Sequence, residues 1–255
     1  MKVLVIPDVH LRWYMFDEAA EIYKKMAAQE LLTEKQERQS VGVVCLMDLP
    51  DDWGKEDDLA SYEKTFDRAI QFVREFREEN IYFCYGNHDI SYVWGKEESG
   101  YSTKAEELVR NKMVELRQAF SNPERLAFLH CIDRTLFSHA GISAYYAMKY
   151  VGNSGSIEQL IYRINHEFSE TELWMDDSPI WVRMQGGYIW PVKSSYLQVV
   201  GHTPVKAPLY DAENELLSLD TFSTDPDGVP IGDCRYVVVD TVQKTFEYAD
   251  RIVDL

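Results

Sequence analysis

The sequence predicts an α/β fold with a largely parallel β-sheet, on the basis of three observations. Short apolar runs at residues 3–6, 41–46 and 81–85 alternate with longer segments of helical periodicity. Such alternation is typical of βαβ units, which build parallel sheets. The 255 residues, of which 45% are hydrophobic and 27% charged, suffice for one large core. We therefore expect a single domain over residues 1–255.

Two successive βαβ units account for the first third of the chain. After the strand at 3–6, apolar residues recur at helical spacing between Phe16 and Ala27, which predicts an amphipathic crossover helix. The strand at 41–46 follows, and a second helix is predicted between Leu59 and Phe76, directly before the strand at 81–85. Crossovers between parallel strands are right-handed in nearly all proteins.

The middle of the chain has a less regular pattern. Residues 90–103 are rich in aromatic residues and glycine without a helical or strand period, and we expect a loop that overhangs the site. A helix is predicted at 104–120. Two short strands at 127–131 and 135–137, joined by a turn at 132–134, indicate a hairpin. The sheet is expected to change from parallel to mixed at this point.

The last part of the chain combines helices, irregular structure and strands. Residues 143–168 are predicted to be helical with a break at 152–155, and the segment up to Trp190 is expected to be irregular and to contact substrate. Strands are predicted at 196–200, near 216–219, at 235–239 and at 245–248. The last of these is expected to form an antiparallel hairpin.

The charge of the chain restricts its partners. A formal net charge of −17 argues against stable binding of nucleic acid or of an anionic membrane, because like charges repel. No apolar run approaches the roughly 18 residues that span a bilayer, so a soluble, cytoplasmic protein is expected. The four cysteines have no zinc-finger spacing, and we expect buried, reduced thiols.

Five of the predicted strands run into a polar residue that can bind metal or move a proton. The residues are listed by strand: Asp8 and His10; Asp48 and Asp51; Asn87 and His88; His139; and His202. Taken alone, Asp8, Asp48, Asp51 and Asn87 are each more often ordinary turn residues than metal ligands. Five strands ending in this way form a constellation that packing does not explain, and such residues collect ligands at the carboxyl ends of strands.

These motifs, taken in order, resemble those of the calcineurin-like metallophosphoesterases. The blocks here are Asp-Val-His at residue 8, Asp-Leu-Pro-Asp at 48, Gly-Asn-His-Asp at 86, Ser-His-Ala-Gly at 138 and Gly-His-Thr at 201. The last two look most like the PPP-type branch, which contains bacterial and phage protein phosphatases and diadenosine tetraphosphate hydrolases. The resemblance implies a four-layer α-β-β-α sandwich of two mixed sheets flanked by helices, with the C-terminal strands in the second sheet.

The resemblance also implies a dinuclear metal site. Asp8 and His10 would join the bridging Asp48 on one ion, and Asn87, His139 and His202 would join it on the other. The pair of ions would lower the pKa of a bridging water, so that a metal-bound hydroxide attacks phosphorus. Manganese is the expected ion, with iron or zinc as alternatives. His88 would protonate the leaving group as the general acid, oriented by Asp51.

One position departs from the family pattern. Asp52 stands where PPP-type phosphatases have an arginine that grips phosphate, and Arg183 or Arg12 is expected to replace it. The expected substrate is a phosphoprotein, a small phosphoester or a nucleotide, cleaved by a PPP-like phosphatase. The alternatives are a nucleotide or dinucleoside polyphosphate hydrolase, a phosphodiesterase, and a catalytically inactive metal-binding scaffold.

Overall fold

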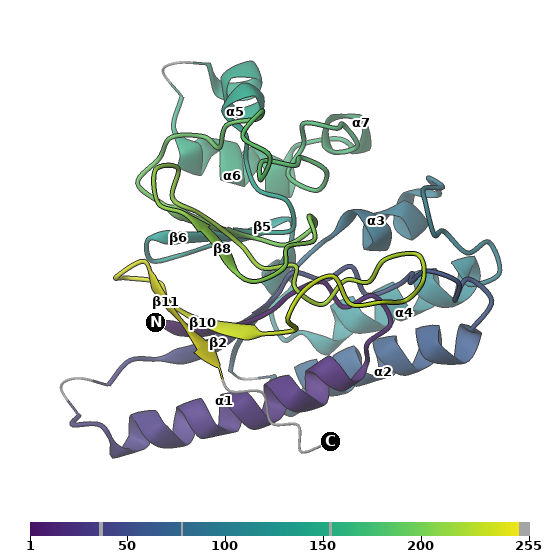
Figure 1. Ribbon diagram of the computed structural model, residues 1–255, viewed down its shortest axis with the longest axis horizontal. Coiled ribbons are helices and arrows are strands. Elements are labelled where there is room, and N and C mark those ends of the chain that lie inside the picture. Colours follow the sequence, from purple (N-terminus) through teal and green to yellow (C-terminus); the bar gives the residue numbers. More distant parts are fainter. Residues whose placement is uncertain (36–37, 78, 153–154, 250–255) are drawn as a thin grey trace.

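Two β-sheets pack against each other at the centre of the molecule, with helices on both sides (Figure 1). The computed structural model describes residues 1–35, 38–77, 79–152 and 155–249. The first sheet has six strands in the order β11-β10-β1-β2-β3-β4, and the second has five in the order β5-β6-β7-β9-β8. This architecture confirms the predicted four-layer α/β sandwich. Residues 250–255 of the predicted single domain lie outside the described residues.

The first sheet contains the two βαβ units that the sequence predicts. Its four parallel strands are β1 (Lys2–Ile6), β2 (Val41–Cys45), β3 (Asn80–Cys84) and β4 (Leu126–Ala127). The helices α1 (Tyr14–Leu32), α2 (Leu59–Glu75) and α4 (Glu106–Ala119) lie along one face of this sheet (Figure 1). Phe16, Phe66 and Phe83 belong to the core between these helices and the sheet. The carboxyl ends of the parallel strands consequently meet at one edge.

The second sheet carries its own helices on its outer face. Its strands are β5 (Leu129–Ile132), β6 (Thr135–Ser138), β7 (Leu197–Val200), β8 (Leu209–Asp211) and β9 (Leu216–Ser218). The helices α5 (Ala144–Val151), α6 (Ile157–His166) and α7 (Glu170–Leu173) lie above it (Figure 1). Part of the helix break predicted at 152–155, namely residues 153–154, lies outside the described residues. β6, β7 and β9 run parallel, so their carboxyl ends also share one edge.

The prediction that the C-terminal strands belong to the second sheet is wrong for two of them. β10 (Tyr236–Asp240) pairs antiparallel with β1, and β11 (Thr245–Ala249) pairs antiparallel with β10. Alternate residues of β10 face the two sides of the sheet: Tyr236 packs in the core beside the helices, and Val237 in the core between the sheets. A strand buried on both faces suits an interior position. The hairpin itself is as predicted.

Two further corrections concern local structure. The segment predicted as a loop from residue 90 begins within a helix, α3 (Asn87–Trp94), because Asp89 caps its first turn by accepting from the Gly86 N–H. The strand predicted at 127–131 is two strands: β4 follows the short 3₁₀ helix η1 (Pro123–Arg125) and joins the first sheet, while β5 starts the second. The chain therefore changes sheets at Phe128.

The cysteines only partly match the expectation of buried thiols. Cys45 and Cys84 are buried, Cys234 is half-buried and Cys131 is exposed. Cys131 lies on β5, the edge strand of the second sheet, which explains its exposure. No helix among the described residues is both long and apolar enough to cross a bilayer.

Candidate metal centre

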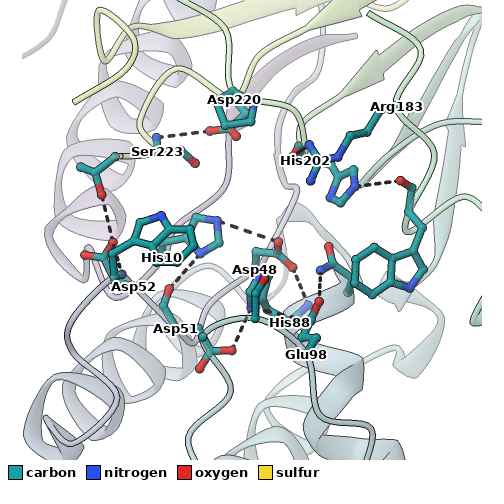
Figure 2. A pocket seen from close by; sticks show the side chains of 17 residues that line it. His10, Asp48, Asp51, Asp52, His88, Glu98, Arg183, His202, Asp220 and Ser223 are labelled. Carbon is teal, nitrogen blue, oxygen red and sulfur yellow. Dashed lines mark hydrogen bonds and ion pairs between the residues drawn. The ribbon is translucent and has the colours of Figure 1, made fainter. Parts of the chain in front are cut away.

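The polar residues predicted at the strand ends gather around one cavity. It has a volume of about 160 Å³, and Figure 2 shows His10, Asp48, His88 and His202 around it. Its walls also include residues that no sequence motif singled out: Trp53, Glu98, Ser99, Gly100, Trp181, Pro204, Asp220, Ser223 and Thr224. Asp8 and His139 lie beneath, fully buried at 0% exposure. The cavity lies where the carboxyl ends of both parallel strand sets converge.

The backbone around the cavity adopts conformations that non-glycine residues rarely take. The φ angles are positive at His10 (42°), Asp48 (47°), Asp51 (64°) and His202 (62°). Backbone hydrogen bonds hold the first two loops together, with the His10 N–H donating to the Asp48 carbonyl at 2.7 Å. Strained backbone of this kind clusters at functional sites.

Asp89 ties the loops after β2 and β3 to each other. Its carboxylate accepts hydrogen bonds from the backbone N–H groups of Asp48 at 2.8 Å, Leu49 at 3.0 Å and Gly86 at 3.1 Å. Gly86 has no side chain, and a Cβ there would overlap with Oδ1 of Asp48. This role of Asp89 does not follow from the strand-end motifs. It depends on the helix that starts at Asn87, which places Asp89 in its first turn.

Three histidines are oriented by backbone carbonyls. The partners of their rings are the Asp51 carbonyl for Nδ1 of His10, the Leu46 carbonyl for Nδ1 of His139, and the Trp181 carbonyl for Nε2 of His202, each at 2.9 Å. A carbonyl oxygen only accepts, so each of these ring nitrogens donates its hydrogen. The other nitrogen of each neutral ring then presents a lone pair. This is the arrangement of metal-binding histidines.

Four acceptor atoms converge at the deepest point of the cavity. Nε2 of His139 lies 3.0 Å from Oδ1 of Asn87, 3.1 Å from Nδ1 of His202 and 3.2 Å from Oδ2 of Asp48. A hydrogen on Nε2 of the protonated His139 ring links these atoms. A divalent cation can take the place of that hydrogen, because all four atoms have lone pairs once the ring is neutral. Ligand atoms of Asp48, His139 and His202 all lie within 4.8 Å of one another.

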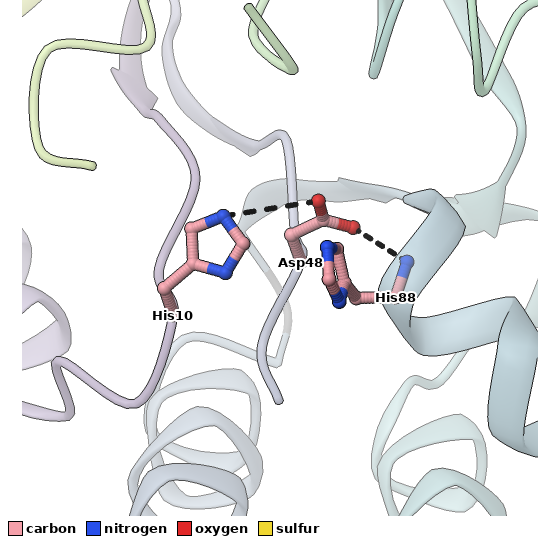
Figure 3. A group of neighbouring side chains, drawn as sticks. All are labelled: His10, Asp48 and His88. Carbon is pink, nitrogen blue, oxygen red and sulfur yellow. Dashed lines mark hydrogen bonds and ion pairs between the residues drawn. The ribbon is translucent and has the colours of Figure 1, made fainter. Parts of the chain in front are cut away.

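A second group with ligand spacing lies beside the first and shares Asp48. It contains His10, Asp48 and His88, again within 4.8 Å, and Nε2 of His10 is 4.0 Å from Oδ2 of Asp48 (Figure 3). Asp8 is not part of this group. Its Oδ2 accepts from the His202 N–H at 2.6 Å, while its buried Oδ1 has no hydrogen-bond partner among the described residues.

The surroundings of Asp8 fit a cation as well. A Cβ at Gly201 would overlap with Oδ1 of Asp8, so only glycine lets the chain pass this carboxylate. Burial and the nearby Asp220 raise the pKa of Asp8 well above its usual value. An unpaired carboxylate oxygen and a set of oxygen and imidazole donors suit a divalent transition-metal ion. The residues present therefore fit the two-ion site that the motifs predict.

The charges of the site favour a positive centre next to Asp48. Burial alone would raise the pKa of Asp48. The nearby His139, His88 and His10 outweigh burial and hold this pKa well below its usual value. Burial lowers the pKa of His139, but Asp48 and Asp8 outweigh burial and raise it to about 9. In contrast, burial and His139 lower the pKa of His202 well below its usual value. The Asp48 carboxylate thus remains charged.

His88 differs from the other three histidines in its partner. Its Nδ1 lies 2.8 Å from Oδ2 of Asp51, and the other oxygen of Asp51 accepts from Tyr62 at 2.7 Å and Tyr92 at 2.5 Å. Burial lowers the pKa of His88, but Asp48, Asp51 and Glu98 outweigh burial and raise it to about 10. This ring is therefore held in its protonated form, as a proton donor requires.

Glu98 is the clearest site residue that sequence reasoning missed. Its side chain is only 7% exposed, and its Oε2 accepts from the Asn87 amide nitrogen at 2.8 Å. That bond directs Oδ1 of Asn87 toward His139. Oε1 of Glu98 lies 3.7 Å from Nδ1 of His88. Glu98 lies beyond the strand motifs in a segment without regular period, so no sequence signal marks it.

The two candidate phosphate-binding arginines lie in different surroundings. Arg12 donates to the His10 carbonyl at 3.0 Å and pairs with Asp52 at 3.4 Å. Asp52 also binds Lys55 at 2.6 Å, so its charge is compensated within the protein. Arg183 is exposed and lines the cavity, where it donates to the His202 carbonyl at 2.9 Å (Figure 2).

Comparisons with known protein families and solved structures found similar proteins. A family model described as calcineurin-like phosphoesterase matches residues 1–231. No curated protein sequence matches the chain.

Two solved structures have a similar fold. A cold-active protein-tyrosine phosphatase of the psychrophile Shewanella sp. has 16% identity and a TM-score of 0.51, with 98% of this chain and 80% of that chain covered. A protein serine/threonine phosphatase from Saccharomyces cerevisiae with similarity to human phosphatase PP5 has 11% identity and a TM-score of 0.52, with 100% and 82% covered.

Proposed function

Since the chain belongs to the calcineurin-like phosphoesterase family and is a phosphoester hydrolase, we propose that it uses two divalent metal ions to hydrolyse a phosphate monoester. The observation that supports two ions best is the orientation of His10, His139 and His202. Each gives one ring hydrogen to a backbone carbonyl, which leaves its other ring nitrogen for a metal ion. Manganese is the ion we propose, with iron and zinc as alternatives.

The proposed ligands divide into two sets that share Asp48. Asp8 and His10 complete the first set, and Asn87, His139 and His202 complete the second. The bound ions supply a nucleophile from water near neutral pH and neutralise charge on the phosphoryl oxygens. The chain contributes the fixed geometry, because each imidazole is held by a backbone carbonyl and the Asn87 amide by Glu98.

The remaining polar residues act on the substrate. Nδ1 of His88 is bonded to Asp51, which leaves its Nε2 for the proton that the leaving alkoxide requires. Arg183 is proposed to bind a phosphoryl oxygen, because it lines the cavity and its hydrogen-bond partners among the described residues are a carbonyl and a hydroxyl. Arg12 is proposed to act indirectly, by neutralising Asp52.

The pairing of Asp52 favours a monoester over a diester or anhydride. An isolated carboxylate at this position would repel the dianion of a phosphate monoester. Because Arg12 and Lys55 both bind Asp52, that repulsion is largely cancelled. The proposal therefore keeps the phosphatase activity first, with a phosphodiesterase or a nucleotide or dinucleoside polyphosphate hydrolase as the alternative.

The test is hydrolysis of p-nitrophenyl phosphate and bis-p-nitrophenyl phosphate by metal-stripped protein with manganese added back. Manganese-dependent cleavage that is faster for the monoester supports the proposal. Faster cleavage of the diester would assign a phosphodiesterase. If the protein binds two ions with high affinity and cleaves neither compound, the remaining alternatives are a very narrow substrate specificity and the inactive scaffold.

A further inference from the structure

A second cavity, of about 410 Å³, lies against the second sheet. It is bounded by the segment 184–191 and by β8 and β9, and its residues are Met184, Gln185, Gly187, Ile189, Trp190, Pro191, Leu209, Tyr210, Asp211, Ala212, Asn214, Leu216 and Ser218. Leu216 packs with Val182 and Met184, whereas its neighbour Leu217 packs between the sheets. The cavity is therefore on the outer face of the sheet, and its volume is within the usual range for ligand sites.

Two residues that line this cavity have buried side-chain atoms without a hydrogen-bond partner among the described residues. These atoms are Oε1 and Nε2 of Gln185 and Oγ of Ser218. A buried polar group without a partner costs roughly 1–3 kcal/mol, so such groups are normally paired. The primary amide of Gln185 offers an acceptor and two donors side by side. A ligand that pairs with it needs a donor and an acceptor in the same arrangement.

The charge of the cavity excludes an anionic ligand group. Of the described residues that line it, none is a lysine, arginine or histidine. The single charged residue, Asp211, is already occupied by the backbone N–H of Glu213 and by the backbone and side chain of Asn214. The rings of Trp190 and Tyr210 lie in the wall. Aromatic faces bind flat rings well. A neutral, planar group with donors and acceptors on its edge fits all of these features.

Two segments of the chain connect this cavity to the metal centre. Arg183 lines the metal cavity, and Gln185, two residues later, lines the second. Ser218 lines the second cavity, and Asp220 lines the metal cavity. Two residues of chain span at most about 7 Å. The cavities are thus neighbours, because at two places in the chain their lining residues are no more than about 7 Å of backbone apart.

We propose that the second cavity binds the nucleobase of a nucleoside monophosphate whose phosphate lies at the metal centre. The inference rests on the proposed function and specifies its substrate class. Water adds to phosphorus, the bond from phosphorus to the ribose oxygen breaks, and His88 supplies the proton for that oxygen. The products are a nucleoside and inorganic phosphate.

The first test measures binding without turnover. Adenosine, guanosine, cytidine and uridine are titrated separately against the manganese-loaded protein by calorimetry. At least one should bind, and Gln185→Leu should weaken its binding about tenfold, the loss expected for one hydrogen bond. Tyr188→Ala is the matched control, because Tyr188 is on the same segment, is 94% exposed and does not line the cavity. Absence of binding by all four nucleosides would overturn the inference.

The second test separates this cavity from the chemistry. Gln185→Leu should raise the KM for the preferred nucleoside monophosphate about tenfold and leave the KM and kcat for p-nitrophenyl phosphate unchanged, because that compound has no base. If Gln185→Leu impaired the kinetics equally for the nucleotide and for p-nitrophenyl phosphate, the role of Gln185 would be merely structural. If the wild type preferred phosphopeptides to nucleotides and Gln185→Leu lost that preference, the cavity would be a peptide-binding site and the inference would be wrong. Nucleoside binding without cleavage of any phosphate ester would support the cavity and reject the proposed function.

Discussion

Asp51 and His88 form a hydrogen bond of 2.8 Å through Nδ1 of the ring, the nitrogen that His10 and His139 give to backbone carbonyls. His10, His139 and His202 each donate to a backbone carbonyl, whereas Nδ1 of His88 faces a carboxylate. A carboxylate favours the charged imidazole and a carbonyl does so much less. The same residue type is thus prepared for two tasks, metal binding and proton donation.

Replacement of His88 by alanine should separate these tasks. We expect His88→Ala to lower kcat at least about 100-fold, because general acid catalysis contributes about that much, and to leave bound metal unchanged. Activity is measured with p-nitrophenyl phosphate and metal content by elemental analysis. His166→Ala is the control, since His166 is on the exposed surface and pairs with Glu124. Loss of one metal ion along with activity would instead make His88 a ligand, as its distance from Asp48 allows.

Glu98 should control metal affinity through Asn87. In Glu98→Ala the Asn87 amide loses its acceptor, so we expect affinity for one of the two ions to fall about tenfold, the usual lower limit for the loss of a ligand's supporting hydrogen bond. Glu98→Gln keeps an accepting oxygen and should retain most of the affinity. Calorimetric titration of metal-stripped protein with manganese gives the comparison, and Glu97→Ala, on the exposed neighbour, is the control. Equal affinities in Glu98→Ala and the wild type would contradict this role.

The sequence predicts the fold well where burial and local period coincide. The strands β1, β2 and β3 and the crossover helices between them follow from apolar patterning alone. Apolar patterning does not predict the sheet to which β10 belongs. The run Tyr236 to Val239 is apolar throughout and would suit the interior of either sheet. Pairing with β1 is decided by contacts across more than 200 residues, which patterning does not encode.

The candidate site shows the same division. The residues at the strand ends follow from motifs, and the structure brings them to one cavity. Glu98, Asp89 and Asp220 were missed, because each acts through a fold-dependent contact rather than through a fixed spacing. Helix α3 was missed for a related reason. Its first turn consists of the polar site residues Asn87 and His88, which hide the helical period.

The two arginines should give opposite results when replaced. Arg183→Ala should raise the KM for p-nitrophenyl phosphate about tenfold with little effect on stability, because Arg183 is exposed at the cavity. Arg12→Ala should lower the free energy of unfolding by about 1–3 kcal/mol, since it removes one of the two cations that pair with the Asp52 side chain, which is only 7% exposed. Urea denaturation and steady-state kinetics distinguish the two. A raised KM with unchanged stability in Arg12→Ala would make Arg12 the phosphate ligand.

His130 should make the stability of the protein depend on pH. The side chain is buried on β5, its Nε2 donates to the Phe83 carbonyl at 2.9 Å, and burial lowers its pKa from 6.5 to about 4. Below pH 6.5 the unfolded chain binds a proton that the folded protein does not bind until about pH 4. The free energy of unfolding therefore falls as the pH drops through this window, by at most about 3 kcal/mol for this group.

The measurement is urea denaturation of the wild type and His130→Gln at intervals between pH 8 and pH 4. Glutamine keeps a donor for the Phe83 carbonyl but does not titrate, so the variant should lose less stability between pH 6.5 and pH 4 than the wild type does. Burial raises the pKa of Asp89 and Glu98 to about 7 in both proteins, so the difference between the two curves isolates His130. Parallel curves would mean that the folded protein already binds this proton near pH 6.5, and that the ring is less desolvated than its burial between the two sheets indicates.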